Sequence, residues 1–193
     1  VKRAAVINYM SAHDNHTLWD KLQLSNADDS VQDRIAMNKL GAAILMISQG
    51  TPFMQAGEEM LRTKDGDENS YKSSDEINNI KWDVLTADSD EYKTMLFYKG
   101  LIEMRKAYPI FRGNGNIAVT FENLAGGGMV AKLDNHMGAY ATVLINPTAS
   151  QASYTLNGDW SLVCDGTKAG AESLGTFTGS VNAPAMTVTV YVK

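Results

Sequence analysis

The sequence predicts an α/β region followed by an all-β region, and two features of its 193 residues predict this division. Residues 1–112 alternate short apolar runs with segments of helical period, which is the βα repeat of an α/β fold. Residues 113–193 are rich in Gly, Thr and Val, carry period-two alternation and show no helical pattern. The second region is therefore expected to form an antiparallel β-sandwich.

Two apolar runs of the first region are expected to be buried parallel strands. AAVINYM (Ala4–Met10) is apolar on both faces, as strands covered by two layers are. PFMQAGEEM (Pro52–Met60) reads as a second such strand and ends in carboxylates. Two strand–helix units fill residues 1–112, whereas a closed (β/α)8 barrel takes ~250 residues. If the fold is a barrel, most of it is missing from this sequence.

The first expected helix lies between these strands. Ser30 is a candidate N-cap, and Asp33 three residues later completes a capping box. Apolar residues then recur as far as Ile47, and the helix is expected to stop at Gly50 and Pro52.

A long polar loop, Leu61 to Asp90, separates the second strand from a second helix. That helix is expected over about Glu91 to Tyr108, because Pro109 ends it and an apolar stripe recurs at helical spacing on Phe97, Leu101, Met104 and Tyr108.

The second region is expected to contain six strands joined by glycine turns. The turns are Gly126-Gly127-Gly128, Asn157-Gly158 and Asp165-Gly166. In the first strand Ile117, Val119 and Phe121 are expected to point inward. The strands are expected at Asn116–Glu122, Met129–Leu133, Tyr140–Ile145, Tyr154–Leu156, Trp160–Cys164 and Met186–Val192.

Composition excludes several classes of function. The chain is 44% hydrophobic and 20% charged, as ordinary globular proteins are. Its net charge of −5 comes without a long basic run, which argues against nucleic acid or a membrane surface as partner. No apolar run is long enough to span a bilayer. The single Cys164 excludes an internal disulfide and a cysteine metal cage, and leaves the cellular location open.

The first candidate site is the stretch INYMSAHDNHTLWDKL, in which Asp14 stands between His13 and Asn15 directly after the first strand. Catalytic groups of α/β folds project from the carboxyl ends of strands, so Asp14 is a candidate catalytic carboxylate. The same residues also fit a polar loop in which Asp14 and Asn15 cap backbone amides. Both interpretations stay open at this point.

Two metal sites are weaker alternatives. His13, Asp14 and His16 could share a zinc ion, but the only other histidine is His136, in the second region. Residues 65–76 place oxygen ligands as a calcium-binding hand does, yet have Ser70 where the turn needs glycine. No metal ligand is therefore assigned.

Three aromatic residues lie in or beside the polar loops, namely Trp19, Tyr71 and Trp82. Flat rings stack on the apolar faces of pyranose sugars, so each is a candidate sugar contact. Packing of the loop is an equally good explanation, above all for Trp82.

The stretch INYMSAHDNHTLWDKL resembles a signature region of the α-amylase superfamily, and its longer form HDN-x-TLWD resembles the type I pullulanases, which are debranching enzymes. GTPFMQAGEEMLRTKDGDENSYKSSDEINNIKW is similar to the pullulanase segment around the eighth barrel strand. The resemblance implies that residues 1–112 are the C-terminal part of a catalytic (β/α)8 TIM barrel. Ala4–Met10 and Thr51–Ala56 would be its seventh and eighth strands, and residues 113–193 the C-terminal sandwich domain.

The resemblance also implies roles for single residues. Asp14 matches the catalytic carboxylate that stabilises the transition state, and His13 matches a sugar-binding histidine. The family often has Lys where Ala12 stands and Gln where His16 stands. The further residues expected to bind substrate are Asn15, Trp19, Asp67, Asn69 and Tyr71.

The function implied is retaining hydrolysis of α-1,6-glucosidic branch linkages in pullulan, amylopectin or glycogen-derived dextrins. The nucleophile and the acid/base would lie upstream of Val1, so the partners are the α-glucan and the remaining part of the barrel, and the isolated chain is expected to be inactive. No redox or organic cofactor is implied, and a structural Ca²⁺ in the parent enzyme is left open. Alternatives are a non-catalytic carbohydrate-binding or structural module, an isoamylase, or a neopullulanase.

Overall fold

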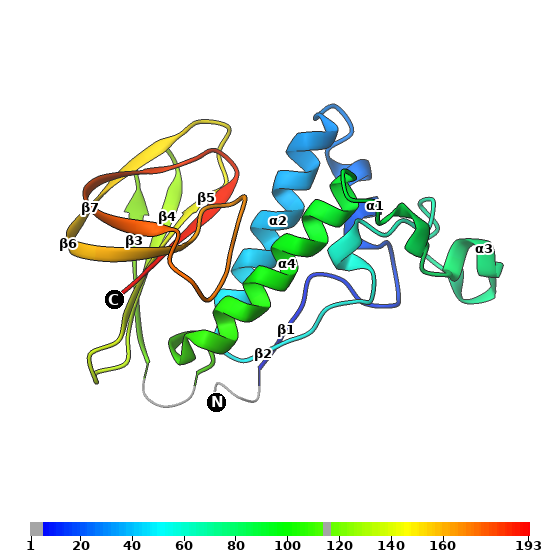
Figure 1. Cartoon of the computed structure of the whole chain (residues 1–193). Coiled ribbons are helices and arrows are strands. Elements are labelled where there is room, and N and C mark those ends of the chain that lie inside the picture. Colours follow the sequence, from blue (N-terminus) through cyan, green and yellow to red (C-terminus); the bar gives the residue numbers. More distant parts are fainter. Residues whose placement is uncertain (1–5, 114–116) are drawn as a thin grey trace.

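A computed structural model describes residues 6–113 and 117–193 (Figure 1). An α/β region comes first in the chain and a six-stranded antiparallel sheet follows it. Figure 1 shows helices α2 and α4 standing between the short strands β1 and β2 on one side and the sheet on the other. None of the helices within the described ranges is long and apolar enough to cross a membrane.

Strands β1 (Ile7–Asn8) and β2 (Thr51–Pro52) pair in parallel, as expected, with Ile7 opposite Thr51. Both are shorter than the sequence predicts, and residues 4–5 of the first run lie outside the described residues. The expected burial is wrong for this chain, because Ile7 is 64% exposed and Phe53 is 46% exposed. The reason is that the described part of this parallel sheet has only two strands, which leaves its apolar side chains without a covering layer.

The two expected helices are present. Helix α2 (Val31–Ile47) begins with the predicted capping box of Ser30 and Asp33. Helix α4 (Asp90–Ala107) begins one residue before the expected start, and Ser89 caps it by accepting from the backbone N–H of Tyr92.

A third helix, α1 (Leu18–Ser25), was not expected from the sequence. The side chain of Thr17 caps it by accepting a hydrogen bond from the backbone N–H of Asp20.

The segment between β2 and α4 consists of short turns. The second predicted strand ends at Pro52, and a 3₁₀ turn preceded by Gly57, which has a φ of 92°, occupies the end of the expected strand. The polar loop also folds into single turns instead of staying irregular. These elements are η2 (Glu58–Met60), η3 (Ser70–Lys72), α3 (Asp75–Asn78), η4 (Trp82–Val84) and, after α4, η5 (Pro109–Phe111).

The β region forms one curled sheet within the described residues, not two separate sheets. Its strand order is β3-β4-β5-β8-β6-β7. The strand expected at Tyr154–Leu156 and the one expected at Trp160–Cys164 are a single strand that bulges at Asn157-Gly158 instead of turning there. The bounds are β3 Ala118–Leu124, β4 Gly128–Asp134, β5 Tyr140–Asn146, β6 Ala152–Cys164, β7 Gly175–Ala183 and β8 Thr187–Val192.

Each face of the sheet has its own apolar core. The outer face packs on α2 and α4 through Val143, Val188 and Val190, which lie among Leu101 and Met104 of the helix. The inner face encloses a smaller cluster where the sheet curls over itself. Phe121, expected to point inward, is 66% exposed. The members of the inner cluster are Leu124, Val130, Leu144, Leu156, Leu162, Val181, Ala183 and Tyr191.

One glycine allows the helix and the sheet to approach closely. A Cβ atom on Gly100, in the middle of α4, would lie 2.0 Å from the backbone oxygen of Ala169. This contact is backbone to backbone, so no side-chain rotation could relieve it. The loop between β6 and β7 therefore rests directly on α4.

Arg105 connects three elements of the first region: α2, β2 and η5. Its buried guanidinium donates through Nη1 to the carbonyl oxygens of Met46 (2.6 Å), Ser48 (2.9 Å) and Phe111 (2.7 Å). Its Nη2 donates to the carbonyl oxygen of Gly50 at 2.7 Å. Burial lowers the pKa of Arg105 from its usual value. One side chain thus fixes the end of α2, the start of β2 and η5 relative to one another.

Replacing Arg105 with Lys should destabilise the chain by about 2–4 kcal/mol, because an ammonium cannot reach all four carbonyls and leaves buried acceptors unpaired. Urea unfolding followed by circular dichroism measures this. Arg112→Lys, at an exposed position, is the matched control. Equal unfolding midpoints for the two variants would contradict the role of Arg105.

Candidate functional site

The loop between β1 and α1 presents Asp14 to solvent at the carboxyl end of β1. The side chains of His13 and Asp14 are 89% and 82% exposed, and His13 Nε2 lies 3.5 Å from Asp14 Oδ1. Asn15 adopts a φ of 65°, which turns the chain sharply after Asp14. No backbone amide is held by Asp14 within the described chain, so its carboxylate is available to a ligand.

Asp14 and Asn15 line a hollow of about 590 Å³ together with His16 and Glu68. His16 is largely buried, and its Nε2 lies 3.6 Å from Glu68 Oε2, so the two loops meet at this pair. The hollow has the size of a small-ligand site. The other residues that line it are Tyr9, Met10, Ser11, Ala12, Thr17, Leu18 and Lys21.

Lys64 fixes the position of the loop that carries Asp14. The Lys64 side chain is buried, and its Nζ donates to the backbone oxygen of His13 at 3.0 Å. The backbone N–H of Lys64 donates to Asp20 Oδ2 at 2.8 Å, and the hydroxyl of Thr63 donates to Asp20 Oδ1. Asp20 is only 1% exposed. The exposed His13–Asp14 pair is therefore supported by a buried cation and a buried carboxylate.

A second anchor connects the same loop to η2. The hydroxyl of Ser11 donates to Glu58 Oε2 at 2.6 Å, and both residues are buried. Burial is the main cause that raises the pKa of Glu58 to about 7. Within the described part of the chain, Oε1 of Glu58 has no hydrogen-bond partner.

Three residues of the expected substrate loop, Asp67, Asn69 and Tyr71, lie on the segment of Glu68, but of that segment only Glu68 itself lines the hollow. Asp67 accepts from the hydroxyl of Ser73 and from the backbone N–H of Asn69 at 2.9 Å. These hydrogen bonds, led by that of Ser73, lower the pKa of Asp67. Tyr71 is 75% exposed, and its ring lies 5.1 Å from the ammonium of Lys72.

Trp19 differs from the other expected sugar contacts. Its half-buried side chain lines a small cavity against Met60, Leu61 and Thr63, away from Asp14. Trp19 therefore packs against the start of the polar loop, at Leu61 and Thr63.

Neither alternative metal site is formed in the described ranges, where no group of three or more His, Cys, Asp or Glu side chains has the geometry to hold a metal ion. His16 contacts Glu68, whereas His13 contacts Asp14.

Sequence reasoning missed Asp20, Glu58 and Lys64, the residues that support the site. Each occurs among charged residues that a reader expects to be exposed. The available signal was the position of Asp20, at the third residue of a helix that begins in the same motif as Asp14.

Comparison with known proteins gives a consistent result. No protein-family model matches the chain. The pullulanase of Bacillus subtilis (strain 168) is 43% identical over 106 residues, which cover 55% of this chain and 14% of that protein. The structure of the pullulanase from Bacillus acidopullulyticus matches 98% of this chain and 24% of its own, with a TM-score of 0.89 and 35% identity. The pullulanase of Anoxybacillus sp. LM18-11 complexed with maltotriose matches 99% and 27%, with a TM-score of 0.82 and 29% identity.

An α/β region with an exposed loop carboxylate, followed by an antiparallel sheet and matched throughout to these structures, relates the chain to the glycosidases of the α-amylase superfamily. Within that superfamily the chain belongs to the pullulanases. It spans about a quarter of the length of the solved relatives.

Glu58 should make stability depend on pH. Its pKa is about 7 in the folded chain, against an ordinary value of 4.5, so between these pH values the folded state holds more protons than the unfolded state. The free energy of unfolding should therefore fall by about 3 kcal/mol from this group as pH rises across that window.

Urea unfolding at several pH values measures this dependence. In the Glu58→Gln variant the free energy of unfolding should not show this decrease as pH rises. Glu76→Gln, which changes an exposed glutamate, is the control. A pH profile that Glu58→Gln leaves unchanged would count against the assignment.

Proposed function

We propose that this chain is part of a retaining glycoside hydrolase that cleaves α-1,6-glucosidic branch linkages in pullulan, amylopectin or glycogen-derived dextrins. Residues 1–112 would complete the C-terminal part of its catalytic (β/α)8 barrel, and residues 113–193 would form its C-terminal β domain. The observation that carries the proposal is the exposed Asp14 at the end of a parallel strand, in a chain similar to pullulanases over nearly its whole length.

Asp14 is proposed to stabilise the transition state. Cleavage with retention develops positive charge on the sugar ring as an oxocarbenium-like species. A carboxylate that accepts hydrogen bonds from ring hydroxyls binds this state more tightly than the ground state. Asp14 has the required freedom, since its side chain is 82% exposed and lies beside the exposed imidazole of His13.

His13 and Asn15 are proposed to bind the same sugar unit. His13 can donate to a hydroxyl, and the contact between Lys64 and its backbone oxygen keeps its position fixed without engaging the imidazole. Because the anchor uses the main chain, both side chains remain available to substrate.

The substrate loop is proposed to bind the neighbouring glucose units through Asp67, Asn69 and Tyr71. The hydrogen bonds of Asp67 to Ser73 and Asn69 give the loop a fixed shape, and the exposed ring of Tyr71 offers a stacking surface. Trp19 is included because its side chain lines a cavity with residues 60–63 and 79–81, which precede and follow the segment of Asp67, Asn69 and Tyr71.

The rest of the barrel is the proposed partner of the exposed side of β1 and β2. Val6, Ile7, Tyr9 and Phe53 are all exposed there, and the rings of Tyr9 and Phe53 meet edge to face at 6.2 Å. Apolar strand residues of this kind are covered by neighbouring strands and helices in barrels. The nucleophile and the acid/base would come from those strands.

A non-catalytic module, an isoamylase and a neopullulanase are the competing functions. Products separate the enzymes, because hydrolysis of the α-1,6 linkages of pullulan yields maltotriose. A module would bind glucan without turnover in any context.

The purified 193-residue chain should release no reducing sugar from pullulan, because it supplies one of the three carboxylates that the proposed mechanism needs. A reducing-sugar assay measures this against the Bacillus acidopullulyticus pullulanase as positive control. Sustained release of maltotriose by the chain alone would refute the proposal that the other two groups lie elsewhere.

The role of Asp14 can be tested by replacing the matching segment of the Bacillus acidopullulyticus pullulanase with this chain. Asp14→Asn in that chimaera should lower kcat on pullulan by about 10²-fold or more, while binding of maltotriose changes little. Asp28→Asn, an exposed aspartate in the loop between α1 and α2, is the matched control. The role fails if both variants turn over at the rate of the unmodified chimaera.

A further inference from the structure

The inner face of the curled sheet changes from apolar to polar along its strands. Near one end, Leu124, Val130 and Leu144 fill the space beneath β6 and β7. The next row on this face after Val130 and Leu144 consists of Thr120, Lys132 and Thr142, and the row after that of Ala118, Asp134 and Tyr140. The apolar core therefore stops before the sheet does.

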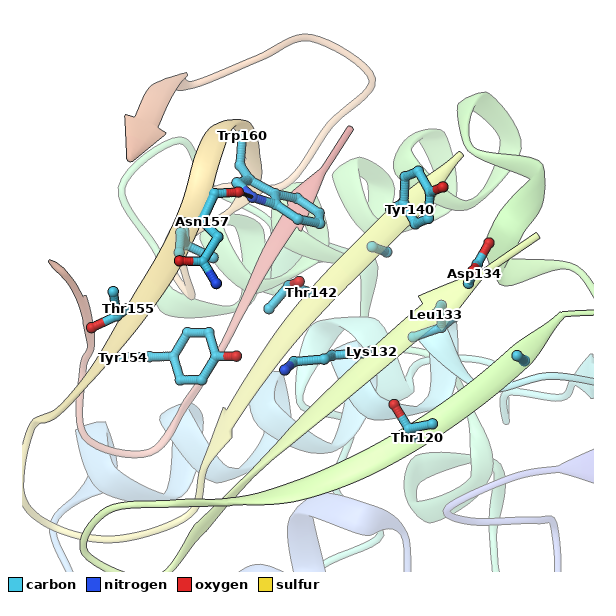
Figure 2. A pocket seen from close by; sticks show the side chains of 13 residues that line it. Thr120, Lys132, Leu133, Asp134, Tyr140, Thr142, Tyr154, Thr155, Asn157 and Trp160 are labelled. Atoms are coloured by element: carbon cyan, nitrogen blue, oxygen red, sulfur yellow. Dashed lines mark hydrogen bonds between the residues drawn. The ribbon is translucent and has the colours of Figure 1, made fainter. Parts of the chain in front are cut away.

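A pocket of about 380 Å³ occupies the space where the core ends. Its floor is made by β3, β4 and β5, and its opposite wall by β6. Figure 2 shows the rings of Trp160 and Tyr154 extending from β6 toward Thr142 and Lys132. This volume lies in the range of small-molecule sites.

The bulge in β6 directs Trp160 into this pocket. Leu156 pairs with Gly179 and Trp160 pairs with Phe177, so residues 157–159 stand opposite the single residue Thr178. Because two extra residues preserve the period of two, Trp160 stays on the inner face with Leu156. The indole Nε1 donates to the backbone oxygen of Asn157 at 3.1 Å, which fixes the orientation of the ring.

Two polar side chains that line the pocket, Tyr154 on β6 and Lys132 on β4, are also held in place. The hydroxyl of Tyr154 donates to Glu122 Oε1 at 2.6 Å, and Lys132 Nζ donates to Glu122 Oε2 at 2.9 Å. Lys132 Nζ lies 5.8 Å from the centre of the Tyr154 ring. The ammonium is thus positioned before any ligand arrives, with donor capacity left for one.

Flat rings beside fixed hydroxyl, amide, carboxylate and ammonium groups match the chemistry of a pyranose, which has an apolar C–H face and a rim of hydroxyls. We propose that this pocket is a second, non-catalytic binding site for an α-linked glucan chain, with Trp160 as the stacking platform. The choice of α-linked glucose rests on the proposed function. The pocket lies on the face of the sheet that does not pack on α2 and α4. Asp14 belongs to the loop after β1, and Figure 1 shows these helices between β1 and the sheet, so a glucan held in the pocket takes no part in the reaction at Asp14.

The test is calorimetric titration of the 193-residue chain with maltoheptaose. Trp160→Ala should weaken binding by about tenfold or more, because it removes the largest buried contact of a sugar. Trp160→Phe, which keeps a flat ring, should retain most of the affinity. Phe121→Ala is the matched control, since Phe121 is a 66% exposed aromatic residue of β3 that does not line the pocket.

The proposal would be overturned by an affinity of Trp160→Ala within about twofold of the parent chain, by equal weakening in Phe121→Ala, or by equal affinity for cellohexaose. Near-ultraviolet circular dichroism confirms that each variant is folded. In the chimaera, Trp160→Ala should raise KM for amylopectin and leave kcat on pullulan unchanged, and an unchanged KM would also count against the site. These measurements fail independently of the Asp14→Asn test, which concerns turnover alone.

Discussion

The arrangement of this chain depends on one buried guanidinium. Arg105 has its four hydrogen bonds to main-chain oxygens and not to a carboxylate. Two of these oxygens belong to the end of α2, where the partial negative charge of the helix favours a cation. Met46 and Ser48 lie at the end of α2, Gly50 directly before β2 and Phe111 in η5, so a single side chain fixes these three elements relative to one another. The strand that leads to the candidate loop is paired to β2, so this constraint also helps to position that loop.

The candidate site repeats this use of main-chain contacts. Lys64 and Glu58 hold the loop of Asp14 through the carbonyl of His13 and the hydroxyl of Ser11, and leave the exposed side chains unengaged. Such an arrangement separates positioning from chemistry: buried groups determine the loop's shape, and exposed groups remain free to bind. Fixing the loop in advance lowers the cost of ordering it when a ligand arrives.

Local signals predicted the elements that local physics controls. The capping box at Ser30 gave the start of α2, and strict alternation gave β8, in which Val188 and Val190 face the helices. Strand β7 was missed because its sequence is mostly polar, since it buries little more than Val181 and Ala183. The contacts that support the candidate site could not be predicted from the sequence, because Lys64 and His13 are 51 residues apart. The family resemblance indicated Asp14 itself, but no sequence pattern predicts which residues hold its loop in place.

The close approach at Gly100 has a consequence for how such proteins are recombined. With the backbone of Ala169 resting against α4, the terminal sheet cannot be exchanged for that of a relative unless the replacement loop follows the same path. Any side chain at this helix position would clash with the backbone of Ala169 and force α4 and the sheet apart. In chimaeras of debranching enzymes the crossover should therefore lie before α4, so that this helix and the sheet come from the same parent.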